Sequence, residues 1–388
     1  MELILKQYDI PLLRFSATND SSTPEIEVHW INEDQRHLLP LDMELSPEGI
    51  SRWMRRRTIP RNRAYVNRLL AKCGLNANRP MGILSLCKGL SVDDSYWVVE
   101  DGFEGTFEKY NLFENRFSEV LALIAFTGYG SSNRSSLASS PEFTTNGMLP
   151  KCWRRISGKV TLYKGGTDGG YNTGAEPYCE YYAAQVAAVM GIDAIPYGLS
   201  QWKGRLCSTC ELFTDIDHAY MPIGNLVQKG GFDAVAAYYE NLGEPFQKAF
   251  RDMLVFDAVI CNTDRHYGNF GFMIDNKTNT IAAPAPLFDH GNSLFNQAGP
   301  EDYESPEAFQ QYIDTLVPCV YDDFFATAKR FMADENREQL RKLLGFRFKR
   351  HVRYNLPPKR LKLMEEQVRK RAMRLLEREL ENANISHI

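Results

Sequence analysis

The stretch VFDAVICNTDRHYGNFGFMIDNKTNTIAAPAPLFDHG, residues 255–291, decides the fold of this chain. It contains Asp264, Asn269 five residues later and, beyond a predicted hairpin, a second carboxylate at Asp289, followed by His290 and Gly291. A phosphoryl-transfer site needs one carboxylate to orient the attacking hydroxyl, and an amide and a second carboxylate to hold Mg²⁺ against ATP. The order of these residues therefore predicts a kinase, with Asp264 as the base and Asn269 and Asp289 as metal ligands.

The polar loop NTDRHYGN, residues 262–269, lies between a predicted buried helix and the apolar strand FGFMI. A polar loop between two such elements is where a rigid scaffold carries a site. We expect Arg265 to steady this loop by pairing with a carboxylate, with a phosphate contact as the alternative. His266 is expected to pack or to bond to backbone, because Asp264 already fills the role of base, and His290 to fill the spacer before Gly291.

Upstream, the sequence predicts a nucleotide-binding hairpin. SEVLALIAFTG, residues 118–128, has the apolar character of a helix, and a segment rich in Ser, Thr and Asn follows it. The strands CWRRI and VTLYK come next, and the second ends at Lys164. Small residues let backbone N–H groups and hydroxyls lie over phosphates, although such a segment can also be a plain surface loop. The predicted phosphate-binding positions are Thr144, Thr145, Asn146, Gly147 and Lys164.

A buried lysine needs an anionic partner, and the next predicted helix supplies one. GAEPYCEYYAAQVAAVMG has helical apolar spacing and stops at Gly191. Glu180 falls in its first turns, whereas Glu176 precedes a proline that disfavours the α conformation. We therefore expect a Lys164–Glu180 ion pair, the alternative being two solvated charges. Two further strands run into Glu211 and Phe213, where backbone groups are expected to meet the adenine edge.

Composition and charge distribution limit the classes of protein to which this chain can belong. The chain has 388 residues, 44% hydrophobic and 24% charged, as in ordinary soluble proteins. Its net charge of −4 conceals a basic segment, residues 337–378, with fifteen Lys or Arg and four Glu. Such a segment could meet nucleic acid or an acidic partner, but an amphipathic helix facing water is the favoured explanation. The helical pair predicted over residues 46–74 is also basic, yet no base-reading motif accompanies it.

Cysteine usage and hydropathy predict a cytoplasmic protein. Of eight cysteines only Cys207 and Cys210 form a C-x-x-C pair, and in a strand these two would face opposite sides. Reduced, mostly buried thiols are therefore expected, rather than a zinc set or disulfides. The first fifteen residues do not show a basic segment followed by a long apolar core, and no run approaches 18 apolar residues. We therefore expect a soluble, unexported protein without membrane association.

These patterns together predict an α+β chain with a two-lobed, protein-kinase-like fold. Residues 1–115 form an additional N-terminal accessory region of short strands and a basic helical pair, with the aromatic-rich residues 95–117 as packing surface or linker. Residues 116–215 form an antiparallel-sheet N-lobe with the phosphate loop, the lysine strand and the glutamate helix. Residues 216–388 form a helical C-lobe with the catalytic loop and the metal-binding Asp289.

The motifs resemble those of a known family. G-x-x-P-K at residues 147–151, N-T-D-R-H-x-x-N at 262–269 and F-D-x-G at 288–291, with Lys164 and Glu180, are similar to those of HipA-like kinases. These are bacterial serine/threonine kinases known as toxins of toxin–antitoxin modules, and the resemblance covers about residues 120–330. It implies ATP and Mg²⁺ as cofactors, an antitoxin-like partner and the same roles for Lys164, Asp264, Asn269 and Asp289. It also implies autophosphorylation in the phosphate loop, with Ser139, Ser140, Thr144 and Thr145 as candidate acceptors.

The chain also departs from this family. Its first 115 residues do not look like the usual small N-terminal domain, which bears on partner binding. The order Asp-Arg-His replaces the His-Arg-Asp of typical protein kinases, and no Ala-Pro-Glu motif follows, so control by activation-loop phosphorylation is not expected. The resulting hypothesis is an ATP- and Mg²⁺-dependent serine/threonine kinase acting on an unidentified protein substrate, with nucleic acid contacted only indirectly. The alternatives are a non-catalytic nucleotide-binding regulatory module, or a kinase-fold enzyme that acts on a lipid or small molecule.

Overall fold

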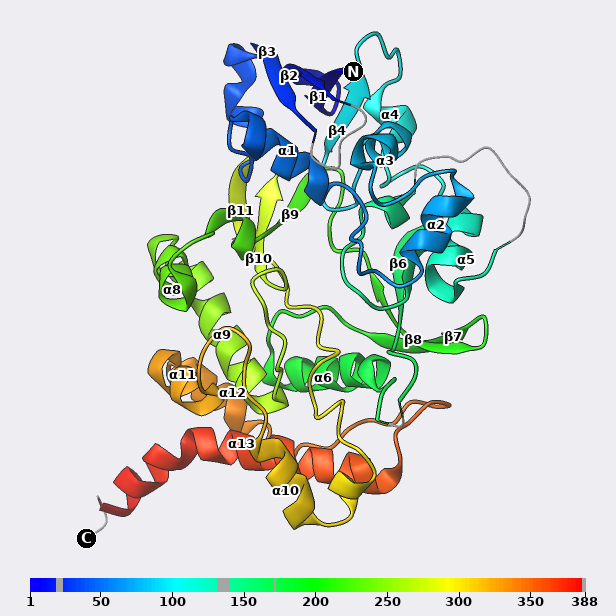
Figure 1. Cartoon of the computed structure of the whole chain (residues 1–388). Coiled ribbons are helices and arrows are strands. Elements are labelled where there is room, and N and C mark those ends of the chain that lie inside the picture. Colours follow the sequence, from blue (N-terminus) through cyan, green and yellow to red (C-terminus); the bar gives the residue numbers. More distant parts are fainter. Residues whose placement is uncertain (19–23, 131–139, 171, 386–388) are drawn as a thin grey trace. The chain divides into compact units, whose positions relative to one another are not determined.

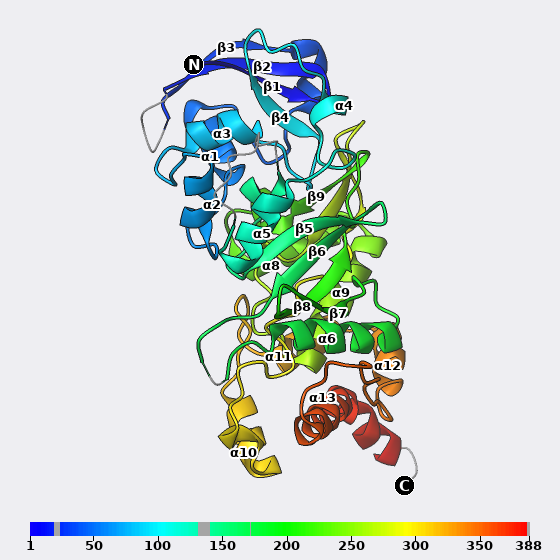
Figure 2. The same cartoon turned by 90° about the vertical axis from the view of Figure 1, so that its right-hand side faces the viewer.

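The computed structural model describes residues 1–18, 24–130, 140–170 and 172–385 (Figures 1 and 2). Its chain separates into two compact units. Unit 1 comprises Met1–Lys164, Glu211–Met221 and Phe272–Ala282, and unit 2 comprises Gly165–Cys210, Pro222–Gly271 and Ala283–Ile388. Strands dominate unit 1 and helices dominate unit 2, in agreement with the predicted α+β class.

Unit 1 begins with a four-stranded antiparallel sheet in the order β3-β2-β1-β4. Its core includes Leu13, Phe15 and Trp53, and Figure 2 shows helices α1 and α3 against one face of the sheet. A short 3₁₀ helix, η1, and a one-turn helix, α4, complete this part. The bounds are β1 (Glu2–Gln7), β2 (Ile10–Ala17), β3 (Ile26–Ile31), η1 (Glu33–Leu38), α1 (Pro47–Arg56), α2 (Val66–Lys72), α3 (Pro80–Cys87), β4 (Tyr96–Glu100) and α4 (Phe107–Tyr110).

Local signals explain most of these elements. Ser46 caps α1 by accepting from the Gly49 N–H at 3.0 Å, with Pro47 at the first helical position. Helix α2 begins later than the expected residue 62, because Tyr65 takes a left-handed conformation with φ of 59°. The expectation that residues 95–117 form packing surface is confirmed, because Trp97, Val99 and Phe107 are buried in a hydrophobic cluster, but strand β4 within them was not predicted. This strand escaped notice because four successive residues are buried, which removes the alternating pattern.

The second part of unit 1 carries the predicted nucleotide-binding hairpin. Ser118 caps α5, accepting from Leu121 N–H at 3.3 Å, and Gly128 ends the helix with φ of 76°. Strands β5 and β6 pair antiparallel, and the register sets Lys151 opposite Lys164. A three-stranded sheet in the order β11-β10-β9 follows. The bounds are α5 (Glu119–Thr127), η2 (Pro141–Phe143), β5 (Lys151–Ile156), β6 (Lys159–Gly165), β9 (His218–Pro222), β10 (Gly271–Asp275) and β11 (Thr280–Pro284).

Unit 2 is built around α9, whose residues 252–260 are all buried. Helices α6, α8, α11, α12 and α13 all contact it. Strands β7 and β8, the two further strands predicted before Glu211, form an antiparallel hairpin that turns at Lys203 and Gly204. The bounds are α6 (Glu176–Met190), β7 (Gly198–Trp202), β8 (Arg205–Glu211), α7 (Ile223–Leu226), α8 (Gly231–Asn241), α9 (Glu244–Ile260), η3 (Glu301–Tyr303), α10 (Pro306–Asp314), α11 (Phe324–Phe331), α12 (Asp334–Arg341) and α13 (Pro358–Ile385).

Two smaller expectations can be compared with these elements. The expectation that Glu176 lies outside the helix is wrong, because α6 begins at this residue with Pro177 just inside it, where proline is tolerated. The expectation of reduced, mostly buried cysteines is confirmed, because all eight lie in the described residues as thiols and five are buried.

Candidate functional site

The loop of residues 262–269 closes on itself directly after α9. Cys261 turns the chain there with a left-handed φ of 54°. Within the loop the Asp264 N–H donates to Asn262 Oδ1 at 3.1 Å, and the Asn269 side chain donates Nδ2–H to the Asp264 carbonyl at 3.1 Å. These bonds hold the half-buried Asp264 and the buried Asn269 in one turn.

Arg265 anchors this loop to α9 through a buried ion pair. Its Nε donates to Asp257 Oδ2 at 2.9 Å and its Nη2 to Asp257 Oδ1 at 3.1 Å. The two side chains are 1% and 0% exposed. Burial raises the pKa of the Asp257 carboxyl, against the opposing effect of the Arg265 charge. The predicted structural role of Arg265 is thereby confirmed.

The same guanidinium also reaches the segment that carries Asp289. Arg265 Nη1 donates to the carbonyl oxygens of Asn269 at 3.1 Å and Phe288 at 2.6 Å. Its Nη2 lies 3.1 Å from His290 Nδ1. Because one rigid fork bonds both segments, it brings the neighbourhoods of Asn269 and Asp289 together.

The histidines have the structural roles expected of them. His290 is fully buried, its ring lies against Phe256, and its backbone N–H donates to Glu180 Oε2 at 2.8 Å. The exposed His266 accepts a bond from the Gly268 N–H at 3.0 Å. Glu180 is itself fully buried on α6, so its carboxylate helps to position the turn after Asp289.

Asn269 and Asp289 fit the donor preferences of Mg²⁺. The Asn269 Nδ2–H group donates to the Asp264 carbonyl. Asn269 Oδ1 is therefore the side-chain atom left to accept a hydrogen bond or to coordinate a metal ion. Asp289 has a left-handed φ of 57°, and its N–H donates to the Tyr197 hydroxyl at 3.2 Å. In the described part of the chain no group of three or more His, Cys, Asp or Glu side chains is arranged so that it could hold a metal ion. Water and phosphate oxygens would have to complete the coordination, as is usual for Mg²⁺.

The predicted phosphate-loop residues lie in unit 1 and differ in accessibility. The Thr144 side chain is 4% exposed and donates to the Leu90 carbonyl at 2.9 Å. The Thr145 hydroxyl donates to the Pro141 carbonyl at 2.7 Å and accepts from Trp153 Nε1 at 3.0 Å. Asn146 and Gly147 are exposed, whereas Ser140 is buried. Ser139 lies outside the described residues.

Lys151 is a candidate site residue that the sequence analysis did not assign. It stands directly opposite Lys164 on the β5–β6 hairpin, and both residues are only 6% exposed. Directly opposed residues of antiparallel strands share one face, where like charges repel, so an anion bound there would offset the repulsion. Lys151 Nζ donates to the Asn146 carbonyl at 2.8 Å, and a Cβ on Gly147 (φ of 90°) would lie 2.2 Å from this Nζ. The positive φ at position 147 therefore favours glycine.

A second buried ion pair supports the segment that carries the predicted phosphate-loop residues. Arg63 Nη2 donates to Glu142 Oε2 at 2.5 Å and to the Lys151 carbonyl at 2.9 Å, and both charged side chains are fully buried. The other carboxylate oxygen of Glu142 accepts from the Trp153 N–H at 2.8 Å. Ala64 N–H donates to the Met148 carbonyl at 2.9 Å. Residues of the accessory region thus fix the backbone on which the loop is built.

The remaining predicted site residues have ordinary surroundings. Glu211 is largely exposed and pairs with Lys159 at 2.7 Å, and the Phe213 ring packs on Tyr220 with centroids 5.5 Å apart. Lys164 belongs to unit 1 and Glu180 to unit 2. Their ion pair stays a prediction.

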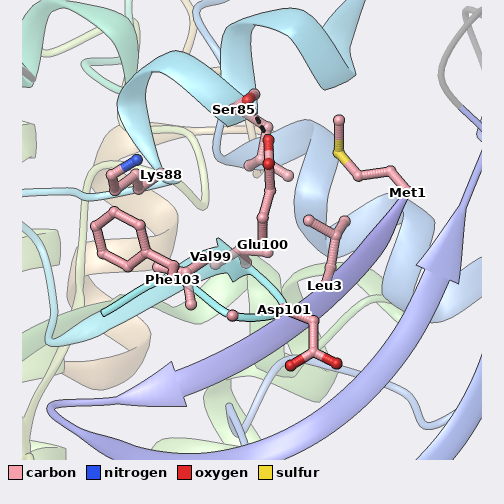
Figure 3. Close-up of a pocket in the computed structure, with 11 residues that line it drawn as sticks. Met1, Leu3, Ser85, Lys88, Val99, Glu100, Asp101 and Phe103 are labelled. Atoms are coloured by element: carbon pink, nitrogen blue, oxygen red, sulfur yellow. Dashed lines mark hydrogen bonds between the residues drawn. The ribbon is translucent and has the colours of Figure 1, made fainter. Parts of the chain in front are cut away.

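Unit 1 also has a cavity of about 270 Å³ between β1, α3 and β4 (Figure 3). Lys88, Glu100 and Phe103 line it, and Ser85 donates to Glu100 Oε1 at 2.9 Å. The Lys88 ammonium lies 4.5 Å from the centre of the Phe103 ring. The lining includes none of the predicted site residues, so this cavity is not part of the phosphoryl-transfer hypothesis.

Within the described residues, no helix is both long and apolar enough to span a membrane.

Comparison with known proteins supplies the remaining context. No family model matches the sequence. The chain is 27% identical over 135 residues to the serine/threonine-protein kinase CtkA of Helicobacter pylori, a match that covers 31% of this chain and 41% of that protein. The chain thus spans about two fifths of the length of this curated relative.

Two solved structures are similar to this one. A crystal structure of the Helicobacter pylori proinflammatory kinase CtkA covers 61% of this chain and 93% of its own, with a TM-score of 0.49 and 16% identity. The HipA of Shewanella oneidensis MR-1, solved with HipB and operator DNA, covers 97% of both chains with a TM-score of 0.52 and 13% identity. The chain therefore has a HipA-like, kinase-type fold over nearly its whole length, and the resemblance to HipA-like kinases that its motifs predict is confirmed.

Proposed function

We propose that this protein is an ATP- and Mg²⁺-dependent serine/threonine kinase of the HipA-like type. The observation that carries the proposal is the network of Arg265. This one side chain bonds the loop that holds Asp264 and Asn269 and the carbonyl that precedes Asp289. A base, an amide oxygen and a second carboxylate supported in this way are the parts that phosphoryl transfer requires.

In the proposed reaction Asp264 orients the acceptor hydroxyl and takes its proton while the hydroxyl oxygen bonds to the γ-phosphorus of ATP. The bond between that phosphorus and the β–γ bridging oxygen breaks, and ADP leaves. Asn269 Oδ1 and the Asp289 carboxylate would hold Mg²⁺, which supplies charge neutralisation at the phosphate oxygens when bound. Lys164, supported by Glu180, and Lys151 bind phosphate oxygens. Because such transfer needs positioning more than covalent chemistry, the rigid support of these groups is the main contribution of the protein.

Further parts of the proposal concern the nucleotide lobe. The backbone at Thr144–Gly147 lies over the phosphates, and backbone groups near Glu211 and Phe213 meet the adenine. Autophosphorylation takes place in the phosphate loop. The division into residues 1–115, 116–215 and 216–388 describes the accessory region, the N-lobe and the C-lobe.

The biological setting is proposed by analogy with the HipA that was solved with HipB and operator DNA. An antitoxin-like protein binds this chain, nucleic acid is reached only through that partner, and the substrate is a protein. The eight cysteine thiols support a cytoplasmic location.

The test is incubation with Mg²⁺ and ATP, followed by mass spectrometry of the intact protein and of its peptides. We expect the unaltered chain to gain one or more phosphoryl groups. In Asp264→Asn we expect no detectable gain, because the rate of transfer should fall by about 10²–10⁴-fold while the affinity for ATP stays unchanged. Full phosphorylation of that variant would refute the role of Asp264. A gain of AMP would indicate nucleotidyl transfer instead, and ATP binding without loss of the γ-phosphate would indicate a non-catalytic nucleotide-binding module.

A further inference from the structure

Asp264 has a side-chain partner that the sequence analysis did not single out. Asn292 donates Nδ2–H to Asp264 Oδ2 at 2.8 Å. We propose that Asn292, held in turn by Asn296, is a positioning residue that sets the orientation of the Asp264 carboxylate for proton transfer. This inference rests on the proposed function, in which Asp264 is the base.

The backbone of Asn292 is fixed to the residue that precedes Asp264. The Asn292 carbonyl accepts from both the N–H of Thr263 at 3.0 Å and its hydroxyl at 3.2 Å. Two residues on, Leu294 N–H donates to the Ile260 carbonyl at the end of α9 at 2.7 Å. Asn292 and Asp264 are therefore held by adjacent backbone contacts as well as by their side chains.

The orientation of the Asn292 amide is determined by Asn296. Asn296 Nδ2–H donates to Asn292 Oδ1 at 2.9 Å. Because an amide oxygen accepts and an amide nitrogen donates, this bond leaves the Asn292 NH₂ group to face Asp264. It also occupies the Asn292 oxygen, which argues against Asn292 as a metal ligand.

Asn296 is anchored from the far side. It is 7% exposed, and Arg360 on α13 donates Nη2–H to the carbonyl oxygens of both Asn296 and Phe295 at 3.1 Å. Leu294 and Phe295 take left-handed φ values of 48° and 63° while almost fully buried. Non-glycine residues rarely adopt this conformation, and it persists only where the surroundings enforce it. The turn that presents Asn292 and Asn296 is thus held by its packing.

The chemistry of an amide suits this role. A neutral N–H donor fixes one carboxylate oxygen without adding a positive charge that would make the carboxylate a weaker base. With Oδ2 held by Asn292, Oδ1 becomes the oxygen that receives this proton. The chain Arg360–Asn296–Asn292–Asp264 therefore selects one orientation of the base, and misplacement of a reacting group by about 1 Å can cost about 10²-fold in rate.

The test compares steady-state phosphoryl transfer by variants with that of the unaltered chain. We expect Asn292→Ala to lower kcat about 10- to 100-fold while the KM for ATP and the Mg²⁺–ATP affinity stay unchanged. Asn292→Asp preserves the shape but sets a second carboxylate against Asp264, so its loss should exceed that of the alanine variant. Asn296→Ala should lower kcat by a smaller factor, because it removes the bond that orients the Asn292 amide but leaves that amide in place.

Asn241→Ala, an exposed asparagine on α8, is the matched control and should leave kcat unchanged. Unchanged kcat in a folded Asn292→Ala or Asn292→Asp variant would overturn the inference. So would weakened Mg²⁺–ATP binding in step with kcat, because that pattern would make Asn292 a nucleotide-site or folding residue. Failure of the proposed function is a separate result, in which the unaltered chain itself transfers no phosphate.

Discussion

Arg265 and Asp257 form a bidentate ion pair in the interior of unit 2. Two charges are costly to bury, and their attraction and hydrogen bonds repay this cost only when the geometry is good. Here Asp257 also accepts from Asn262 Nδ2 at 3.2 Å, and Arg265 serves two carbonyl groups. Removal of Arg265 would break five side-chain contacts and removal of Asp257 three, and either change would leave a buried charge at the site.

The first prediction concerns this pair. We expect Arg265→Met to lower the free energy of unfolding by about 3–5 kcal/mol and to abolish phosphoryl transfer, and Arg265→Lys to lose most activity because it lacks the fork. Urea denaturation and the transfer assay measure the two effects. Arg341→Met, which breaks the exposed Arg341–Glu338 pair, is the control and should cost at most about 1 kcal/mol. Equal losses in both variants would contradict the special role of Arg265.

A second residue-scale prediction concerns pH. Burial, followed by the nearby Asp94 charge, raises the pKa of Asp93 to about 6, against the lowering effects of Ser91 and Arg57. The folded state therefore binds the proton more tightly than the unfolded chain, whose carboxyl has a pKa of 3.8. The free energy of unfolding should then fall as pH rises from about 4 to about 6, and stay lower above this range.

Asp93→Asn mimics the protonated carboxyl and should remove this dependence. At pH 7.5 the variant should be more stable than the unaltered chain by about 1–3 kcal/mol, the upper figure being a ceiling because the residue keeps part of its surface exposed. At pH 4 the two proteins should differ little. Urea midpoints at both pH values test this, and equal midpoints at pH 7.5 would refute it.

At the scale of elements, the phosphate loop depends on residues far from it in sequence. Arg63 and Glu142 are 79 positions apart and fully buried together. Arg63 belongs to the basic helical pair predicted over residues 46–74, and its side chain bonds Glu142 and the Lys151 carbonyl. A basic residue in a charged segment can therefore be a core residue.

The third prediction follows from this contact. We expect Arg63→Met to speed amide hydrogen exchange across residues 142–151 and to weaken ATP binding at least about tenfold, since an uncompensated Glu142 would remain buried. Arg63→Lys should show the same changes to a smaller degree. The neighbouring Arg61 is exposed, and Arg61→Met should leave exchange and affinity unchanged. ATP affinity retained in both Arg63 variants would contradict the dependence of the loop on this pair.

At the scale of the whole molecule, the proposed binding of nucleotide should change the stability of the folded chain. A ligand that binds only the folded state raises its stability by about 2.7 kcal/mol at a hundred times its dissociation constant. We predict that Mg²⁺–ATP raises the melting temperature and that ATP with a chelator raises it less. In Asp289→Asn the increment due to Mg²⁺ should disappear while the increment due to ATP alone remains. A full Mg²⁺ increment in that variant would exclude Asp289 as a ligand.

The sequence by itself determined the local structure and the order of the candidate site. The helix expected from residue 46 onward begins at the Ser46 cap, because a capping hydroxyl acts within one turn. The spacing of Asp264 and Asn269 predicted one loop, and that loop closes through their own hydrogen bond. Strand β4 was missed because a strand buried on both faces has no alternating pattern.

Only the tertiary structure decided which distant residues meet. The pairing of Arg265 with Asp257, the bond from Asn292 to Asp264 and the contact of Arg63 with Glu142 depend on how helices and turns pack. The left-handed turn at Leu294 and Phe295 is likewise imposed by its surroundings, since neither residue type favours that conformation. Local propensity reports on neighbours along the chain, whereas these contacts join segments whose approach is fixed by the burial of apolar surface.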